Sequence, residues 1–103
     1  MTRVLVVGVA VMDFVFYVDA FPTGGMKHRA RDAAVVGGGC AANAAVAIAR
    51  LGGEALLSTR LGSDQVGRMI HDDLVGEGVN LSLTDRSGTR SSYSSILIDG
   101  AGE

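Results

Sequence analysis

A chain of 103 residues, 48% hydrophobic and with 15 glycines, is long enough for one globular domain and too apolar for a disordered tail. Its formal net charge of −2, without a basic cluster, argues against nucleic acid or an anionic membrane as a partner. The single cysteine, Cys40, excludes an internal disulfide and favours a reducing, cytoplasmic location. We expect Cys40 to be a small buried side chain.

The first element is predicted to be a strand buried on both faces, as in a parallel sheet covered by helices. Residues 4–11 are continuously apolar and rich in β-branched side chains. Asp13 is the first polar residue after this run, where ligands of open α/β sheets bind. Asp13 and Asp19 interrupt the apolar residues, which argues against a signal peptide, and Asp13 excludes a membrane span here.

Two shorter extended segments are expected next. Residues 14–18 predict a short strand, and residues 21–25 predict a turn because they contain proline and glycine. Residues 27–36 alternate loosely between polar and small apolar side chains, which predicts a strand with one solvated face. Its basic side chains could meet an anionic ligand, although charge on an edge strand more often serves solubility; they are Lys27, Arg29 and Arg31.

The middle of the chain predicts two helices separated by a strand. Residues 41–51 are rich in alanine and lie between glycine runs, which predicts a helix. Residues 54–61 predict the next strand. A second helix should begin at a cap formed by Ser63 or Asp64, and its apolar residues fall at helical spacing: Val66, Met69, Ile70 and Leu74.

The last quarter predicts a polar loop over residues 85–91, a strand over 92–98 and a turn over 99–102. No return strand follows the turn, and two helices would leave much of a parallel sheet uncovered. We therefore expect the sequence to represent the first part of a longer fold.

The glycine-rich segment 37–39 is the strongest candidate for chemistry. Glycines before a helix expose backbone N–H groups at its positive end and let a small ligand approach the backbone. Asn43 follows in the first turn, and its amide can bind a sugar hydroxyl. On composition alone, the alternative interpretation of these residues is a plain glycine-rich turn that binds no ligand. The segment is neither a Walker A loop nor a dinucleotide fingerprint, which argues against a piece of a Rossmann-type oxidoreductase.

Residues 38–62 resemble the first signature of the PfkB sugar-kinase family. The signature requires paired glycines, an asparagine, a small residue and two later glycines, and every constrained position matches: Gly38, Gly39, Asn43, Ala45, Gly52 and Gly62. Asp13 and residues 62–67 fit the same family. The resemblance implies the N-terminal part of a ribokinase-like three-layer α/β/α fold, with core elements at residues 3–12 and 38–82 and lid strands at about 14–36 and 92–103.

The resemblance also implies a sugar site and an absent catalytic half. Asp13 would accept hydrogen bonds from two sugar hydroxyls, Gly38 and Gly39 would let the sugar lie on the backbone, and Asn43 would bind a further hydroxyl. ATP and Mg²⁺ are implied for the full-length parent. The family's catalytic base lies in a downstream motif that these residues do not contain, so no catalytic residue and no metal ligand is expected here, and the 103 residues alone should be inactive.

Local sequence favours particular sugars within this family. The segments 11–13, 17–18, 21–23, 37–39 and 91–94 look most like sulfofructose kinases, with ketohexose kinases close behind. Ribokinases often carry asparagine two positions before the aspartate, where this chain has Val11. A non-catalytic sugar-binding remnant without an ATP site is the alternative. Lid strands in this family often pair between subunits, so a homodimer through the lid is a further expectation.

Overall fold

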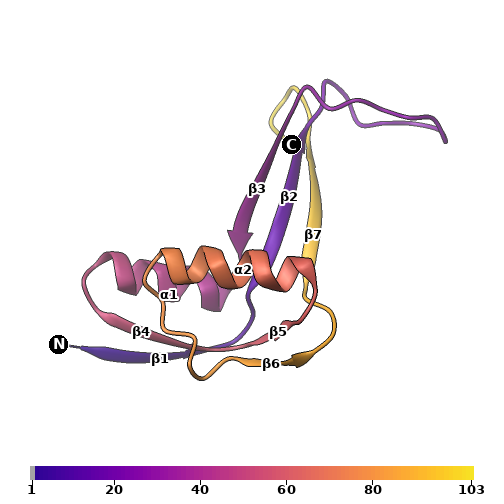
Figure 1. Ribbon diagram of the computed structural model, residues 1–103. Coiled ribbons are helices and arrows are strands. Elements are labelled where there is room, and N and C mark those ends of the chain that lie inside the picture. Colours follow the sequence, from indigo (N-terminus) through magenta and orange to yellow (C-terminus); the bar gives the residue numbers. More distant parts are fainter. Residues whose placement is uncertain (1) are drawn as a thin grey trace.

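The chain divides into a helix-covered layer of parallel strands and a three-stranded sheet that stands away from it (Figure 1). The computed structural model describes residues 2–103. The Cα radius of gyration is 15.9 Å, compared with about 13 Å for a compact chain of this length. The difference arises because the second sheet and its loop project from the rest of the molecule.

The helix-covered layer, called the core layer below, contains two parallel strand pairs. β1 (Arg3–Val7) pairs with β4 (Glu54–Ser58), and β5 (Arg60–Gly62) pairs with β6 (Asp85–Gly88). α1 (Cys40–Arg50) leads into β4, and α2 (Gln65–Gly76) follows β5. Small side chains let α1 pack closely on the sheet, and the residues of this core with no exposed surface are Ala45, Ala55, Leu57 and Leu61.

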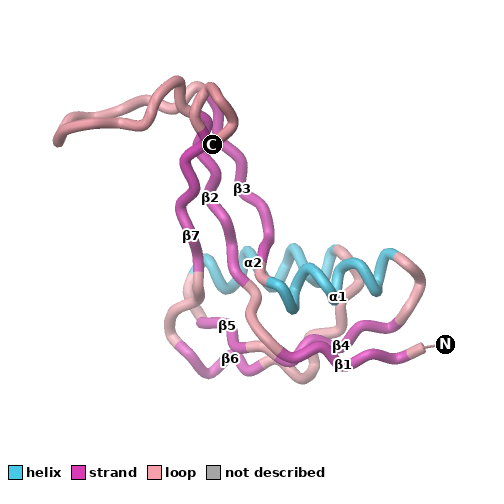
Figure 2. The backbone as a smooth tube through the Cα atoms, turned by 180° about the vertical axis from the view of Figure 1, so that it is seen from behind, coloured by secondary structure: helices cyan, strands magenta, loops and turns pink. Residues whose placement is uncertain are grey.

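Both helices cover the same face of these strands, as the two views of the backbone show (Figures 1 and 2). The opposite face of β1 is uncovered within residues 2–103, where Leu5 is 57% exposed and Val7 is 72% exposed. We expected the first strand to be buried on both faces. Within the described part of the chain, β1 is covered on one face only. Neither helix is long and apolar enough to span a membrane.

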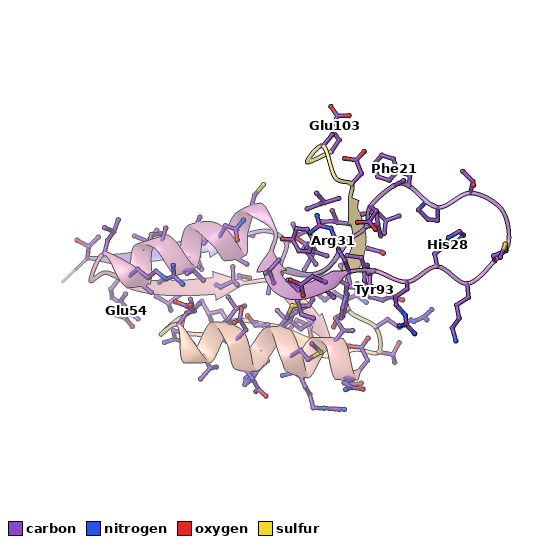
Figure 3. All side chains as sticks on the ribbon, turned by 90° about the horizontal axis from the view of Figure 1, so that it is seen from above. Phe21, His28, Arg31, Glu54, Tyr93 and Glu103 are labelled. Atoms are coloured by element: carbon purple, nitrogen blue, oxygen red, sulfur yellow. The ribbon has the colours of Figure 1, made fainter. Side chains whose placement is uncertain are left out.

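The projecting sheet, called the lid below, has β2 (Val11–Tyr17) at its centre. β3 (Asp32–Gly38) pairs with it in antiparallel fashion on one side, and β7 (Tyr93–Ile98) pairs in parallel on the other. A long exposed loop joins β2 to β3, and Figure 3 shows Phe21 and His28 on it, far from both helices. The lid expected from the sequence is thus present, built from strands far apart in the chain.

Several predicted boundaries are wrong in detail. The apolar run 4–11 is not one strand, because the chain breaks at Gly8, where a Cβ would lie 2.8 Å from the Ala41 Cβ and would push α1 away. Residues 11–12 consequently belong to the lid. Residues 27–31 form loop, whereas the segment expected to be a polar loop contains β6. Cys40 is exposed at the first turn of α1.

The start of α2 is joined to the linker before β7 by a compact hydrogen-bond network. Asp64 caps the helix by accepting from the Gly67 N–H at 2.9 Å, and it also accepts from the N–H and hydroxyl of Ser91. The Ser91 hydroxyl in turn accepts from the Gly62 N–H at 2.8 Å. These bonds lower the pKa of Asp64, chiefly through the backbone N–H of Ser91. The network fixes where β7 begins relative to the core layer.

Candidate functional site

Asp13 lies in the lid, at the end of the central strand nearest the core layer. It is the third residue of β2, not the residue closing a core strand as the sequence suggested. Its carboxylate is half-buried, and its Oδ1 accepts a hydrogen bond of 2.6 Å from the Ser94 hydroxyl on β7. Within residues 2–103 the other oxygen, Oδ2, accepts no hydrogen bond. One oxygen is therefore positioned by the protein and the other remains able to bind a donor.

Gly38 provides the space beside this carboxylate. It ends β3 opposite Val11, and a Cβ at Gly38 would lie 2.5 Å from Asp13 Oδ2 and 3.2 Å from Val11 Cγ2. Any other residue would therefore displace the carboxylate. The absence of a side chain at Gly38 keeps Asp13 Oδ2 free on the side facing β3. This is a direct steric reason for the glycine that the sequence signature requires at this position.

The two neighbouring glycines have different surroundings. A Cβ at Gly37 would lie 2.7 Å from an Asp73 carboxylate oxygen on α2. Gly39 precedes α1 with φ of 94°, and a Cβ there would lie 2.5 Å from the Val9 carbonyl oxygen. That carbonyl accepts from the Ala42 N–H at 3.3 Å. Gly39 therefore allows the first turn of α1 to contact the β1–β2 connection. From the sequence alone, this packing role of Gly39 could not be distinguished from a role in contacting a ligand.

Asn43 lies in the first turn of α1 with its side chain exposed. It lines a cavity of about 540 Å³ together with Gly37, Gly38 and Val11. The rest of the lining comes from the facing sides of α1 and α2 and is mostly apolar. Asp13 does not line this cavity. Gly38 is the link, because it lines the cavity with Asn43 and also touches the Asp13 carboxylate.

A second cavity, of about 390 Å³, lies beyond the carboxyl ends of β1 and β4. Its lining comes from three connections at the base of the lid and from the first residue of β5: Gly8, Val9, Ala10, Thr59, Arg60, Arg90 and Ser92. Ser92 directly precedes β7, and its carbonyl accepts a hydrogen bond of 3.3 Å from the N–H of Met12, the residue before Asp13. Neither Asp13 nor Ser94 lines this second cavity.

Sequence reasoning missed Ser94 and the arginines of this cavity. Asp13 and Ser94 are separated by 81 positions, and their contact depends on β7 pairing with β2. Serine at alternate strand positions was the one visible signal, and it does not identify the partner strand. Arg90 lay in a segment predicted to be loop, where a lone basic residue is unremarkable.

The residues described here do not form a metal site. Among residues 2–103, no group of three or more His, Cys, Asp or Glu side chains could hold a metal ion. Mg²⁺ depends on several oxygen ligands in near-octahedral geometry. This part of the chain therefore offers Mg²⁺ no cluster of three such side chains.

A helix-covered parallel layer carrying an upright β lid, with a carboxylate at their junction, defines the beginning of a ribokinase-like sugar kinase. The structure of Arabidopsis thaliana ribokinase complexed with ribose and ATP matches 99% of this chain and 33% of its own, with a TM-score of 0.89 and 26% identity. Fructokinase from Vibrio cholerae O395 matches all of this chain and 32% of its own, with a TM-score of 0.76 and 33% identity.

The sequence comparisons agree with this class. Residues 1–103 match the family model described as pfkB family carbohydrate kinase. The uncharacterized sugar kinase YegV of Escherichia coli (strain K12) is 36% identical over 100 residues, which make up 97% of this chain and 31% of that protein. The chain therefore belongs to the pfkB family of carbohydrate kinases, and it spans about a third of the length of these relatives.

Proposed function

We propose that this chain supplies the sugar-binding part of an ATP-dependent kinase that phosphorylates a hydroxyl of a ketohexose or a sulfofructose-type sugar. Asp13 accepts hydrogen bonds from sugar hydroxyls, Gly38 and Gly39 let the sugar lie against the backbone, and Asn43 binds a further hydroxyl. The phosphoryl-transfer residues belong to the remainder of the kinase. On this proposal residues 1–103 alone bind sugar without turning over ATP.

The observation that carries the proposal is the asymmetric environment of the Asp13 carboxylate. Ser94 holds Oδ1, while Oδ2 faces the bare backbone of Gly38. A carboxylate oxygen is a strong acceptor for hydroxyl donors, and such charge-assisted bonds are about twice as strong as neutral ones. Closure of the lid over a bound sugar would exclude water, which limits wasteful hydrolysis of ATP.

The choice of a ketohexose over ribose is supported by Val11. This side chain lies on the same face of β2 as Asp13 and packs beside Gly38, so it offers neither donor nor acceptor to a sugar. A family member with asparagine here would have one more polar contact.

Sugar titration of the full-length protein, with turnover of ATP measured in parallel, tests the proposal. Asp13→Asn should weaken fructose binding by about 10- to 100-fold, because hydrogen bonds to a charged group are worth about 1.5–3 kcal/mol. Asp32→Asn is the matched control, since Asp32 is an exposed aspartate of the lid that bonds its own neighbour, Ala33. Unchanged binding in Asp13→Asn would refute the assignment. Sugar binding without ATP turnover by the full-length protein would favour the non-catalytic alternative.

We propose in addition that the free edge of the lid pairs with a second copy of the chain. β3 lies at the edge of its sheet, and Val35 and Val36 are 51% and 46% exposed on it. Exposed apolar edge strands are templates for further strand pairing. Val35→Lys should convert a dimer to a monomer in analytical ultracentrifugation, and a monomeric parent protein would refute the pairing. The lone cysteine supports a cytoplasmic location for such an enzyme.

A further inference from the structure

The space between α1 and α2 forms a groove that reaches the base of the lid. It is the cavity of about 540 Å³ described above, which begins at Gly37 and Gly38 of β3 and is called the helix groove below. Its apolar lining comes from the facing sides of the two helices: Val46, Ala47, Leu51, Ile70 and Leu74. A contiguous apolar concavity of this size is typical of a surface that binds a partner.

The rim of the helix groove beside the lid is acidic. Asp72 and Asp73 are exposed on α2, and a Cβ at Gly37 would lie 2.7 Å from an Asp73 carboxylate oxygen. Within residues 2–103 Asp73 forms no ion pair, and Arg50, which also lines the groove, is paired with Glu77. The end of the groove next to the edge strand β3 therefore favours a partner that carries basic groups.

The exposed loop between β2 and β3 has the complementary chemistry. Residues 19–29 are all exposed, and among them Phe21 and Met26 are 50% and 78% exposed. Lys27 and Arg29 follow Met26 closely, and within the described residues neither forms an ion pair. Apolar side chains next to unpaired basic ones match an apolar groove with an acidic rim.

The direction of the loop points it at the groove of a second copy. The loop and the two helices project to opposite sides of the lid (Figures 1 and 2), so a chain's own loop lies away from its own groove. Two β3 edges that pair around a two-fold axis at Val35 run antiparallel, which places Asp32 of one copy opposite Gly38 of the other. The same rotation turns the loop of each copy toward the helices of its partner.

The loop is also long enough to fill the groove. Met26 precedes Asp32 by six residues, which span at most about 20 Å when extended. The part of α1 that lines the groove, residues 43–51, is about 12 Å long. From a start beside Gly38, the tip of the loop can therefore reach any part of the groove.

We propose that the β2–β3 loop of one copy lies in the helix groove of a second copy. Phe21 and Met26 contact the apolar lining, and Arg29 lies beside Asp73 on the rim. The inference rests on the proposed pairing of lid edges and extends it, because each copy then covers an apolar groove of the other.

Disulfide crosslinking of the full-length protein, with Cys40 replaced by serine, tests the docking. Met26→Cys and Ala47→Cys are placed in separate chains and mixed, so that a link between positions 26 and 47 joins two copies. Mild oxidation with oxidised glutathione should give this link, identified by mass spectrometry of the joined peptides. Leu83→Cys is the matched control for Ala47→Cys, because Leu83 is 52% exposed and does not line the groove. Equal yields with Leu83→Cys and Ala47→Cys, or no link to position 47 in a dimeric protein, would overturn the docking.

A second crosslink separates the docking from the strand pairing. Val35→Cys should link to itself where two β3 edges pair. A link at position 35 without one between 26 and 47 would leave the pairing in place and refute the docking, whereas the reverse result would support the docking and refute the pairing. A monomeric protein would refute both. Sugar binding by Asp13 depends on neither crosslink and is measured separately.

A charge exchange tests the contact at the rim. Asp73→Lys should weaken dimerisation by about five- to tenfold in sedimentation equilibrium, because a lysine there repels the basic loop of the second copy. Arg29→Glu in the same chain should restore most of the lost affinity, since opposite charges then face each other again. Additive losses in the double variant would contradict the contact between the loop and this rim.

Discussion

The core layer and the lid use apolar residues in opposite ways. In the core layer the alanine-rich face of α1 and the strands beneath it exclude solvent, and Leu57 and Leu61 have no exposed surface. In the lid, three strands form one sheet with little covering it, so Val35, Val36 and Tyr93 are 51%, 46% and 61% exposed. The difference indicates that the core layer holds most of the packed apolar core, whereas the lid leaves much of its apolar surface accessible.

The candidate site lies where these two regions meet, and residues from both contribute to it. Asp13 and Ser94 come from the lid, whereas Asn43 and the second cavity come from α1 and from the connections of the core layer. A ligand at this junction would contact both regions at once. Binding would then favour a fixed lid orientation, as expected for a sheet that closes over a substrate.

The sharpest way to test the contrast is to truncate one leucine in each region. Leu57→Ala should lower the free energy of unfolding by about 2–5 kcal/mol, because it leaves a cavity in a fully packed core. Leu97→Ala in the lid should cost less than about 1 kcal/mol, since Leu97 is already 38% exposed. Urea denaturation of both variants gives the comparison. Equal losses would show that the lid is as well packed in solution as the core layer, contrary to its exposed surface here.

A second test concerns two glycines that have nearly the same positive φ but differ in their surroundings. Gly39 has φ of 94° and Gly52 has φ of 91°, yet a Cβ at Gly39 would collide with the Val9 carbonyl while none at Gly52 meets an atom within 4 Å. Gly52→Ala should cost about 1–2 kcal/mol from backbone strain alone. Gly39→Ala should cost about 1–3 kcal/mol more, the usual penalty of overpacking.

The same pair of variants reports on function. Gly39→Ala should also weaken sugar binding, because it displaces the start of α1 and with it Asn43, whereas Gly52→Ala should leave binding unchanged. Urea denaturation and sugar titration of each variant check both effects. Indistinguishable stability of the two variants would show that α1 does not need its close contact with the β1–β2 connection.

The two helices of the core layer were predictable from sequence because their signals are local, whereas the single strand predicted over residues 54–61 is two strands, β4 and β5, in different sheets. Alanine content, flanking glycines and the cap at Asp64 placed both helices to within a residue or two. The spaced glycines and Asn43 also identified the family. The break between β1 and β2 was not predictable, because β-branched residues continue across Gly8 and the reason for the turn is the approach of Ala41 from elsewhere in the chain.

The lid and the site were less predictable because their contacts are long-range. β7 pairs with β2 across about eighty positions, so the Ser94–Asp13 bond and the second cavity follow from topology and not from any local pattern. Cys40 was expected to be buried from the habit of cysteine in general, yet its place at a helix start next to the open junction leaves it exposed. Local chemistry therefore gave the candidate residues, and only the fold showed which of them lie together.

The network between the two regions should depend on pH through Asp64. Its hydrogen bonds from Ser91 and Gly67 hold the pKa of Asp64 below its ordinary value. Because the folded pKa is depressed, this contribution to stability is present above about pH 4, the pKa of an unfolded aspartate, and is lost as pH falls through the lower folded value. Asp64→Asn keeps an N-cap acceptor but removes the charge.

The urea midpoint, compared between about pH 6 and pH 3, should therefore fall less in Asp64→Asn than in the wild type. Ser91→Ala, which removes the hydroxyl and leaves the backbone bond, should show an intermediate fall. An equal fall in the wild type and in Asp64→Asn would mean that other acidic groups account for the whole dependence.

The smallest effect is expected for the ion pair that joins the ends of the two helices. Arg50 donates from Nε and Nη2 to the two carboxylate oxygens of Glu77 at 2.8 and 2.6 Å, and this hydrogen bonding lowers the pKa of Glu77. The Arg50 side chain is 65% exposed, as is that of Arg3, which pairs with Glu54 through a single contact of 2.9 Å.

A double-mutant cycle on each pair, with alanine at both positions, should give a small coupling that is larger for Arg50–Glu77 because its geometry is bidentate. Both couplings should shrink between about 0.1 M and 1 M salt, since exposed charges are screened. Strong, salt-independent coupling at Arg50–Glu77 would show that the helix ends form a rigid clamp, and the stability of the core layer would then depend on its surface as well as on its packed leucines.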